Sequence, residues 1–308
     1  MGIIKKVKSY FTSRIKNIVR TTGYSIPYFP YDKGASDYII PKTEVNYPKC
    51  DQGLPIPPFE LSAGYGYDQK IYLQYGKIDI DNMLDILKPV SFEINGGKRI
   101  LDFGCSSGRM VRWLKSFTDN NEIWGTDISA DHIYWANKYL NPPFHFAVNT
   151  TFAHLPFEDK YFDLIYSGSV FTHIDNLNET WLLEMRRILS EKGFFYVTIH
   201  DNDTLRIINE KQNMGLYHYI KNHPMSSKIK NGFDMFVLNR IKSSPQVFFD
   251  KAYFEKLINP LFDIVSRNPG SYQEYQTAYV LKRKVQYLKL LFFYLCQSYS
   301  DFFKLCLA

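Results

Sequence analysis

The sequence predicts an α/β fold, in which a mostly parallel sheet carries helices on both faces. Three observations support this prediction. From residue 99 onward, short apolar strands alternate with helical segments of about 10 to 15 residues, which is the pattern of βαβ units. The first of these strands runs into a turn with the sequence GCSSG at 104–108. Asp102 and Asp127 stand at the ends of the first two strands, at the edge where parallel sheets bind ligands.

The alternation can be followed element by element. The predicted strands are RILDF (99–103), EIWGTD (122–127), FHFAV (144–148), YFDLIYS (161–167), GFFYVTIH (193–200), FDIVSR (262–267) and QTAYVLKRK (276–284). The predicted helices between them are MVRWLKSF (110–117), DHIYWANKYL (131–140), TWLLEMRRIL (180–189) and DKAYFEKLI (250–258). Before the first strand, a helix is expected to turn Ile78, Ile80, Met83, Leu84 and Leu87 toward the core.

The pattern divides the chain into four parts. In residues 1–20, apolar residues recur at helical spacing and basic residues stand between them. This pattern predicts a basic amphipathic helix. Residues 21–76 are rich in Tyr, Pro and Gly and predict an irregular strap lying on the domain. Residues 77–284 form the main domain, with a less regular insertion at 201–248. Residues 285–308 predict an apolar C-terminal helix.

The net charge of +6 lies entirely in residues 1–20, which hold six basic and no acidic residues. A nucleic-acid-binding domain carries its basic excess on the folded body, so we expect no nucleic acid partner. The basic helix predicts contact with an anionic membrane surface, or else packing on the body or in a homodimer.

No segment approaches the roughly 20 apolar residues that a membrane span needs, and no secretory leader is evident. We therefore expect a cytoplasmic protein, peripheral at the inner membrane face. Four widely separated cysteines, Cys50, Cys105, Cys296 and Cys306, favour a reducing compartment and lack metal-ligand spacing, so no metal site is predicted.

The turn at 104–108 admits two interpretations. It fits G-x-S-x-G, in which Ser106 would be the nucleophile of an α/β-hydrolase. A hydrolase also needs an oxyanion-hole loop before the turn and several strands ahead of it, and neither precedes residue 99. Asp163, His173 and His200 could supply the acid and the base by residue type alone.

The second interpretation is a cofactor loop, and it accounts for more residues. Asp127 ends the second strand 19 residues after Gly108, where an acid accepts hydrogen bonds from ribose hydroxyls. The carboxylate of Asp102 would repel the pyrophosphate of a dinucleotide, but it would attract a cofactor that carries an ammonium and a sulfonium. S-adenosylmethionine is such a cofactor.

On these residues the chain resembles the class I S-adenosylmethionine-dependent methyltransferases. The resemblance rests on ILDFGCSSGR, GTDIS, LPFEDKYFDLIYSGSVFTHI and RRILSEKGFFYVTIH, four motifs in order between residues 99 and 200. It implies a Rossmann-like seven-stranded sheet whose last strand, QTAYVLK, runs antiparallel to the others. It also implies S-adenosylmethionine as the cofactor.

The resemblance carries over to individual positions. Gly104 and Gly108 would line the methionine part of the cofactor, with Asp102 near its amino group. Asp127 would hold the ribose, Ile128 would pack on the adenine, and Ser106 would replace the usual middle glycine. The remaining expected cofactor-binding residues are Cys105, Asn149, Thr150, Phe152 and Ser167. The family commonly has an aspartate after the third strand, but this chain has no acid between Phe144 and Phe157.

Methyl transfer needs mainly an acceptor held in line with the methyl group, and a base where the acceptor is a hydroxyl. His173 and His200, which follow the fourth and fifth strands, are the candidate bases, with an ordering role for His173 as the alternative. We expect a saccharide or envelope-component hydroxyl as acceptor, with a protein or small metabolite as the alternative. A non-catalytic interaction module on the same fold would keep the sheet and lose the cofactor.

Overall fold

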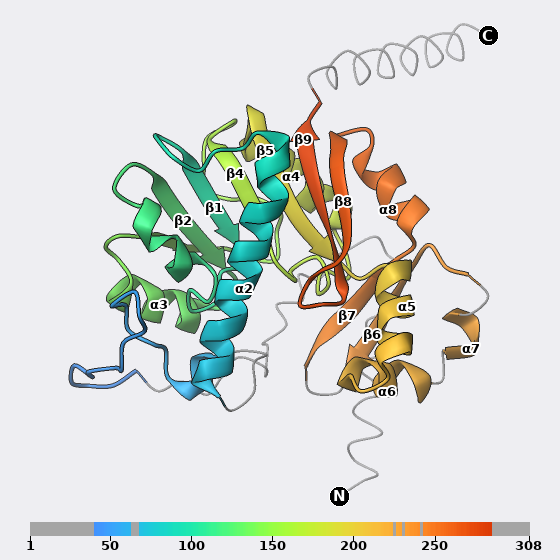
Figure 1. Cartoon of the computed structure of the whole chain (residues 1–308), viewed down its shortest axis with the longest axis horizontal. Coiled ribbons are helices and arrows are strands. Elements are labelled where there is room, and N and C mark those ends of the chain that lie inside the picture. The colour runs from blue at the N-terminus through green and yellow to red at the C-terminus, as the bar shows by residue number, and fades with distance from the viewer. Residues whose placement is uncertain (1–39, 63–67, 224–225, 230–231, 241–242, 285–308) are drawn as a thin grey trace, which may run out of the picture. The chain divides into compact units, whose positions relative to one another are not determined.

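A seven-stranded sheet forms the centre of the chain (Figure 1). The structure is a computed structural model that describes residues 40–284, except 63–67, 224–225, 230–231 and 241–242. The helices expected at 1–20 and 285–308, and the first half of the expected strap, lie outside the described residues.

The strand order is β3-β2-β1-β4-β5-β9-β8, and it confirms the predicted sheet. β9 is antiparallel to both of its neighbours, whereas β1 to β5 pair in parallel. The chain leaves β1 first toward β2 and β3 and then toward β4 and β5, so the order reverses beside β1. Ligands of open α/β sheets bind at such a reversal, beyond the carboxyl ends of the strands. The strands are β1 (Arg99–Phe103), β2 (Glu122–Asp127), β3 (His145–Val148), β4 (Phe162–Ser167), β5 (Leu189–Ile199), β8 (Phe262–Tyr272) and β9 (Gln276–Arg283).

Helices cover both faces of the sheet, because successive side chains along each strand point to opposite faces. Ile100 of β1 packs in one core with α2 (Gln69–Leu87), the 3₁₀ helix η3 (Val111–Phe117) and α3 (Ala130–Tyr139). Leu101 packs in a second core with α4 (Asn178–Ile188) and α8 (Lys251–Ile258). The prediction of helices on both faces is confirmed.

Two details of this side of the sheet differ from expectation. Residues 111–117 coil as a 3₁₀ helix, and α2 approaches their start so closely that a Cβ on Gly76 would lie 2.4 Å from the carbonyl oxygen of Arg109. In α2, Ile80, Met83 and Leu87 are buried as predicted and Leu84 is half-buried, whereas Ile78 is 40% exposed. Its position on the helix faces away from the sheet.

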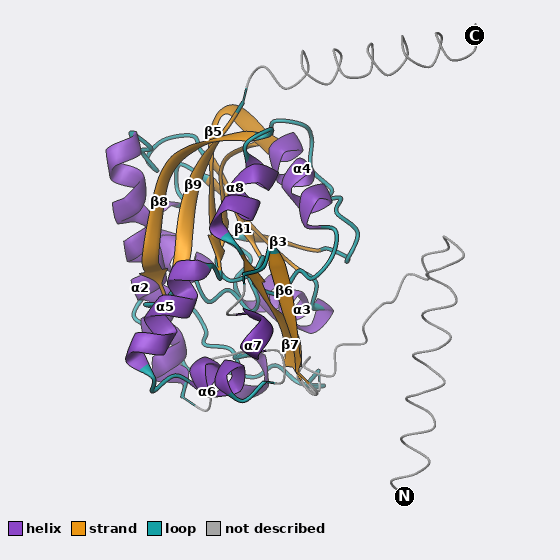
Figure 2. Ribbon diagram, turned by 90° about the vertical axis from the view of Figure 1, so that its right-hand side faces the viewer, coloured by secondary structure: helices purple, strands orange, loops and turns teal. Residues whose placement is uncertain are grey.

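The insertion after β5 is more regular than predicted. It contains the helices α5 (Asn202–Lys211), α6 (Gly215–Lys221) and α7 (Ser226–Ile229) and the two-stranded sheet of β6 (Met235–Arg240) and β7 (Ser243–Phe249). Its buried residues Ile208, Leu216, Leu238 and Phe248 form a small core of their own. Figure 2 shows α6 and the β6–β7 hairpin beyond the end of the large sheet where β5 finishes.

The described part of the strap, residues 40–62, has one short 3₁₀ helix, η1 (Phe59–Leu61), and another, η2 (Lys88–Val90), follows α2. The strap buries Cys50, Leu54, Ile56 and Leu61 in the same core as α2. The guanidinium of Arg112, fully buried, donates hydrogen bonds to the carbonyl oxygens of both Pro55 and Gly108. The strap is thereby fastened to the back of the loop that follows β1.

Candidate functional site

The loop from Gly104 to Gly108 leaves the end of β1 in a conformation that favours glycine. Gly104, Ser106 and Gly108 have φ angles of +86°, +51° and +80°. A Cβ on Gly104 would lie 2.1 Å from Cγ2 of Val170, and one on Gly108 would lie 2.5 Å from Cδ1 of Leu140. Ser106 therefore adopts a left-handed conformation, at the position where the resemblance implies a glycine.

Asp127 ends β2 and fixes this loop. Its Oδ2 accepts a hydrogen bond of 2.8 Å from the backbone N–H of Ser106, and its Oδ1 accepts one of 2.8 Å from the N–H of Ser129. The carboxylate therefore ties the loop after β1 to the start of α3. Each oxygen retains a further lone pair for a ligand hydroxyl.

Asp102 lies behind the loop and is buried. Burial raises the pKa of its carboxyl to about 7, against lowering influences from the Tyr166 hydroxyl and Arg109. Its Oδ2 has no hydrogen-bond partner among the described residues. A buried acceptor without a partner is costly, and a ligand ammonium would satisfy it.

Other buried polar atoms at the carboxyl ends of the parallel strands also lack partners within the described ranges. They are Oγ1 of Thr126, Oγ of Ser129, Oδ1 of Asn149 and Oγ of Ser167. They follow or end β2, β3 and β4, so with Asp102 they gather at one edge of the sheet. This polar set fits S-adenosylmethionine, which offers an ammonium, a carboxylate, ribose hydroxyls and an adenine edge.

Two exposed apolar side chains follow the carboxyl ends of β2 and β3. Ile128 is 54% exposed and Phe152 is 52% exposed. Asn149 donates its backbone N–H to the carbonyl oxygen of Asp127, which brings the end of β3 to this point. Thr150 is exposed, and its hydroxyl accepts a hydrogen bond from the N–H of Phe152. The arrangement suits the flat apolar face of an adenine.

Cys105 is buried, and its side chain packs against β2. A Cβ on Gly125 of β2 would lie 2.7 Å from its Sγ. Burial, together with Asp102 and Asp127, raises the pKa of the thiol well above its ordinary value, so the thiol stays neutral. Any contact of Cys105 with a cofactor would come from its backbone.

His132, in the first turn of α3, is a neighbour of the loop that the sequence pattern did not indicate. Its Nδ1 lies 3.2 Å from Oγ of Ser106. Burial lowers the pKa of its imidazole, and Asp127 and Asp131 act in the opposite direction. The spacing of Ser106 and His132 in the sequence carries no signal for this contact, because it depends on how α3 packs against the loop.

His173 lies in the loop after β4, and this loop meets the cofactor loop directly. Val170, three residues before it, is the side chain against Gly104. The loop is held by the hydroxyl of Thr198, which accepts the N–H of Ser169, and by the N–H of Val247, which donates to the carbonyl oxygen of Thr172. Nδ1 of His173 lies 2.8 Å from the carbonyl oxygen of Pro245 in β7.

His200 and Asp201 follow β5 and are both buried. The ring of His200 lies between Phe248, at 4.7 Å, and Tyr275, at 5.7 Å between centroids. Asp201 caps α5 through the N–H of Thr204 and forms an ion pair with Arg267. The structure therefore brings His173 to the loop region of the site and encloses His200 among aromatic rings.

A buried ion pair stands behind the site. Nη1 of Arg109 donates a hydrogen bond of 2.7 Å to Oδ2 of Asp79 in α2. Nη2 of the same guanidinium donates to the hydroxyl of Tyr272 at the end of β8. Both partners of the pair are shielded from solvent. This contact fixes α2 to the segment after the loop, and it engages the guanidinium that could otherwise have reached a ligand carboxylate.

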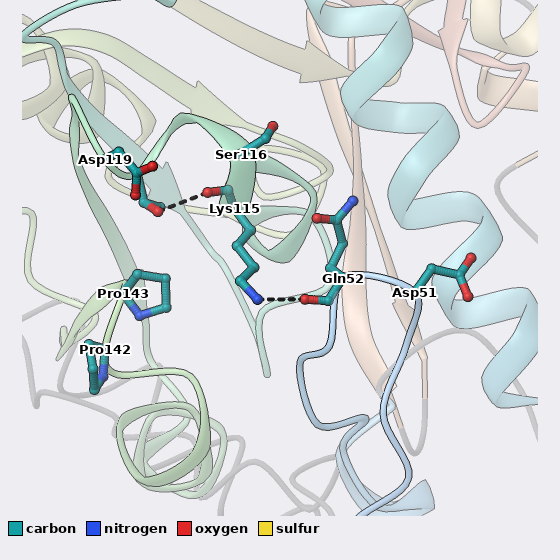
Figure 3. Close-up of a pocket in the computed structure, with 8 residues that line it drawn as sticks. Asp51, Gln52, Lys115, Ser116, Asp119, Pro142 and Pro143 are labelled. Carbon is teal, nitrogen blue, oxygen red and sulfur yellow. Dashed lines mark hydrogen bonds between the residues drawn. The ribbon is translucent and has the colours of Figure 1, made fainter.

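A hollow of about 500 Å³ lies elsewhere, at the amino ends of β2 and β3 (Figure 3). Lys115 crosses it and donates a hydrogen bond to the carbonyl oxygen of Gln52. Asp102 and Asp127 are at the opposite ends of their strands, so this hollow is separate from the cofactor loop. The described residues contain no group of three His, Cys, Asp or Glu side chains that could hold a metal ion.

Comparison with known proteins agrees with this geometry. Residues 101–197 match the family model of a methyltransferase domain. An uncharacterized protein of Methanocaldococcus jannaschii is 29% identical over 158 residues, which are 51% of this chain and 59% of that protein. The sterol 24-C-methyltransferase of Schizosaccharomyces pombe is 32% identical over 108 residues, 34% of this chain and 28% of that enzyme. The matches thus span less than two thirds of these relatives' own lengths.

The fold has a counterpart among solved structures. A protein of Pyrococcus horikoshii OT3 superposes with a TM-score of 0.51 at 20% identity, covering 70% of this chain and 97% of that one. Within the described ranges, no helix of the chain is both long and apolar enough to cross a membrane.

Proposed function

The chain carries a class I S-adenosylmethionine-dependent methyltransferase domain, and from this premise we propose that it transfers a methyl group to a hydroxyl acceptor. The observation that carries the proposal is the joint placement of Asp102, the Gly104–Gly108 loop and Asp127 at the carboxyl ends of β1 and β2. That placement provides a counter-ion for an ammonium, a close backbone approach and an acceptor for ribose hydroxyls.

When bound, S-adenosylmethionine supplies a methyl group already activated by a sulfonium. The residues that would hold it are those of the loop together with Asp102, Asp127, Ile128, Phe152 and the unpaired polar atoms of Asn149 and Ser167. The protein's own contribution is to align the acceptor and to exclude water.

His173 is the base that we propose for a hydroxyl acceptor. As the acceptor oxygen bonds to the methyl carbon and the carbon–sulfur bond breaks, the hydroxyl proton passes to the imidazole. The proposal is supported by the contact of the His173 loop with Gly104 through Val170. His200 remains a candidate by sequence, but the aromatic rings on its two sides favour a packing role.

The hydrolase alternative gains one specific observation, the hydrogen bond between Ser106 and His132. Against it, the described residues include no carboxylate that hydrogen-bonds His132, and the antiparallel β9 agrees with the sheet that the resemblance to methyltransferases implies. A non-catalytic module is the other alternative. Binding of the cofactor distinguishes it from the enzyme.

The proposal is tested in two steps. Calorimetry should detect binding of S-adenosylmethionine by the native chain, and its absence would favour the non-catalytic module or the hydrolase. Methyl-labelled cofactor should then be supplied to a cell extract, with the label sorted among lipid, saccharide, protein and nucleic acid. We propose a saccharide or envelope-component hydroxyl as acceptor, so the label should enter the saccharide or lipid-linked fraction.

We also propose that residues 1–20 bring the chain to an anionic membrane surface, based on the net charge of this segment. Each basic residue near such a surface contributes about 1 kcal/mol at best. Sedimentation with anionic vesicles should show binding at low salt that weakens at high salt and is lost on truncation of residues 1–20. Binding that survives truncation would assign the contact elsewhere, and a dimer in the absence of vesicles would favour packing between copies.

A further inference from the structure

The imidazole of His173 is held by a strand of the insertion rather than by the large sheet. Its Nδ1 lies 2.8 Å from the carbonyl oxygen of Pro245, and the amide nitrogen Nε2 of Gln246 lies 3.3 Å from the same atom. Both residues belong to β7, more than 70 positions later in the chain. The candidate base is thus assembled from two segments that are far apart in the sequence.

The contact with Pro245 determines which ring nitrogen carries the proton. A carbonyl oxygen can only accept a hydrogen bond, so at 2.8 Å the Nδ1 of His173 must be the donor. A neutral imidazole has a single N–H, which leaves the lone pair on Nε2. The amide nitrogen of Gln246 lies 3.3 Å from the same atom, and two donors cannot bond each other. A protonated Nδ1 therefore requires the Gln246 amide to be flipped, with its oxygen beside the ring.

The same strand also fixes the backbone that carries His173. The N–H of Val247 donates to the carbonyl oxygen of Thr172, and the N–H of Phe249 donates to that of His200. On the other side, Gln276 of β9 donates to the hydroxyl of Ser169 at 2.9 Å. The histidine loop is therefore clamped between the large sheet and β7, and neither its backbone nor its ring is placed by β4 alone.

We propose that the Pro245 carbonyl is a positioning group for the base: it holds His173 as the Nδ1–H tautomer, so that Nε2 accepts the proton of the acceptor hydroxyl. This inference rests on the proposed methyl transfer. After the transfer, His173 is an imidazolium whose Nδ1–H still donates to Pro245, and Nε2 later returns its proton to solvent.

The strand that carries Pro245 is itself anchored in the small core of the insertion. β7 belongs to the core of the insertion, where Phe248 stacks on Phe236 with centroids 4.6 Å apart. A displacement of the β6–β7 hairpin would move the Pro245 carbonyl and with it the constraint on the tautomer.

Two substitutions separate the two ring nitrogens. The amide nitrogen of His173→Asn occupies the place of Nδ1 and can still donate to Pro245, but it offers no base. The amide nitrogen of His173→Gln reaches toward the place of Nε2 and loses the contact with Pro245. Gln246→Ala is the matched control, because it removes the side chain beside the ring and keeps the Pro245 carbonyl.

Nitrogen NMR of the full chain labelled at histidine should show a protonated Nδ1 and an unprotonated Nε2 for the His173 resonance at neutral to basic pH. Both histidine variants should lose about 10²-fold or more in turnover. Only His173→Gln should also weaken hydrogen-exchange protection of the Val247 amide, while Gln246→Ala should keep the tautomer and most of the activity.

An Nε2–H tautomer in the native chain would overturn the proposal, as would equal loss of Val247 protection in both histidine variants. A loss of the tautomer in Gln246→Ala would assign the positioning role to the glutamine side chain instead of the carbonyl. Calorimetric titration with S-adenosylmethionine runs in parallel: a native chain that shows the predicted tautomer but no cofactor binding would contradict the proposed function and leave the positioning contact intact.

Discussion

The carboxylate of Asp127 accepts a 2.8 Å hydrogen bond from the backbone amide of Ser106, 21 residues earlier in the chain. This contact joins the end of β2 to the loop after β1, so Asp127 shapes the loop in addition to its proposed role as an acceptor for ribose hydroxyls. Loss of the Asp127 side chain should therefore lower both the stability of the fold and the affinity for the cofactor.

Asp127→Ala should weaken S-adenosylmethionine binding by roughly 1.5–3 kcal/mol, the contribution of hydrogen bonds to a charged group. It should also lower the melting temperature, because the amides of Ser106 and Ser129 lose their acceptor. Calorimetry and thermal unfolding measure the two effects. Asp131→Ala, which removes a neighbouring charge in α3, is the control and should change the affinity little. Equal effects of the two substitutions would mean that Asp127 acts only through its charge.

Ser106→Gly should preserve or improve cofactor affinity. A left-handed conformation costs an L-residue roughly 1–2 kcal/mol, and Ser106 has a φ of +51°. Glycine removes this cost and gives up one hydrogen bond to His132, which contributes about 1 kcal/mol. Binding is measured by calorimetry. The native chain should also show no detectable hydrolysis of an activated ester. An esterase activity that is present in the native chain and lost in Ser106→Gly would instead support Ser106 as the nucleophile of a hydrolase.

Cofactor affinity should rise with pH around neutrality. Burial raises the pKa of Asp102 to about 7, so much of the population is protonated at and below that pH. A ligand ammonium pairs with the ionised form, and binding should release a proton. Affinity should increase roughly tenfold between about pH 6 and about pH 8, since the competent fraction increases by that amount. Titrations in buffers of different ionisation enthalpy detect the released proton, and Asp102→Asn should show weaker binding without this pH dependence.

The raised pKa of Asp102 also predicts that the protein without cofactor becomes less stable as pH rises, whereas its affinity for the cofactor increases. Asp102 keeps its proton in the folded state up to about pH 7, whereas in the unfolded chain it ionises near its ordinary value of 3.8. The folded state binds the proton more strongly, so this contribution to the free energy of unfolding is complete at acidic pH and is lost as pH rises toward 7. Chemical denaturation of the native chain and of Asp102→Asn, compared across this range, isolates the contribution. If the free energy of unfolding of the native chain depended on pH in the same way as that of Asp102→Asn, the raised pKa of Asp102 would be contradicted.

Asp79→Ala should destabilise the fold by about 3–5 kcal/mol, because it leaves the buried guanidinium of Arg109 without its counter-ion. Chemical denaturation measures the loss. Asp81→Ala in the same helix is the control: Asp81 pairs with Lys77 on the surface, and removal of an exposed pair costs at most about 1 kcal/mol. Similar losses in the two variants would show that the Asp79–Arg109 pair is not shielded from water.

The sequence by itself determined the order of the strands of the large sheet and of the helices between them, outside the insertion. β2 begins and ends at the predicted residues 122 and 127, and the GCSSG turn follows β1 as predicted. These features are local. A buried strand needs a short apolar run and a tight turn needs residues that tolerate positive φ, so both are visible within a few positions. Asp102 and Asp127 could be found from the sequence because each stands next to the end of a strand that is itself visible locally.

Only the tertiary structure decided which side chains meet at the candidate site. Val170 against Gly104, His132 beside Ser106, and Pro245 beneath His173 each join segments that no sequence period connects. The same holds for the regular hairpin inside the insertion and for the outward position of Ile78, since both depend on which surfaces pack together. Side-chain packing and hydrogen bonding act between atoms a few ångströms apart in space, whatever their separation in the chain, so a periodicity of about 3.6 or two residues cannot encode them.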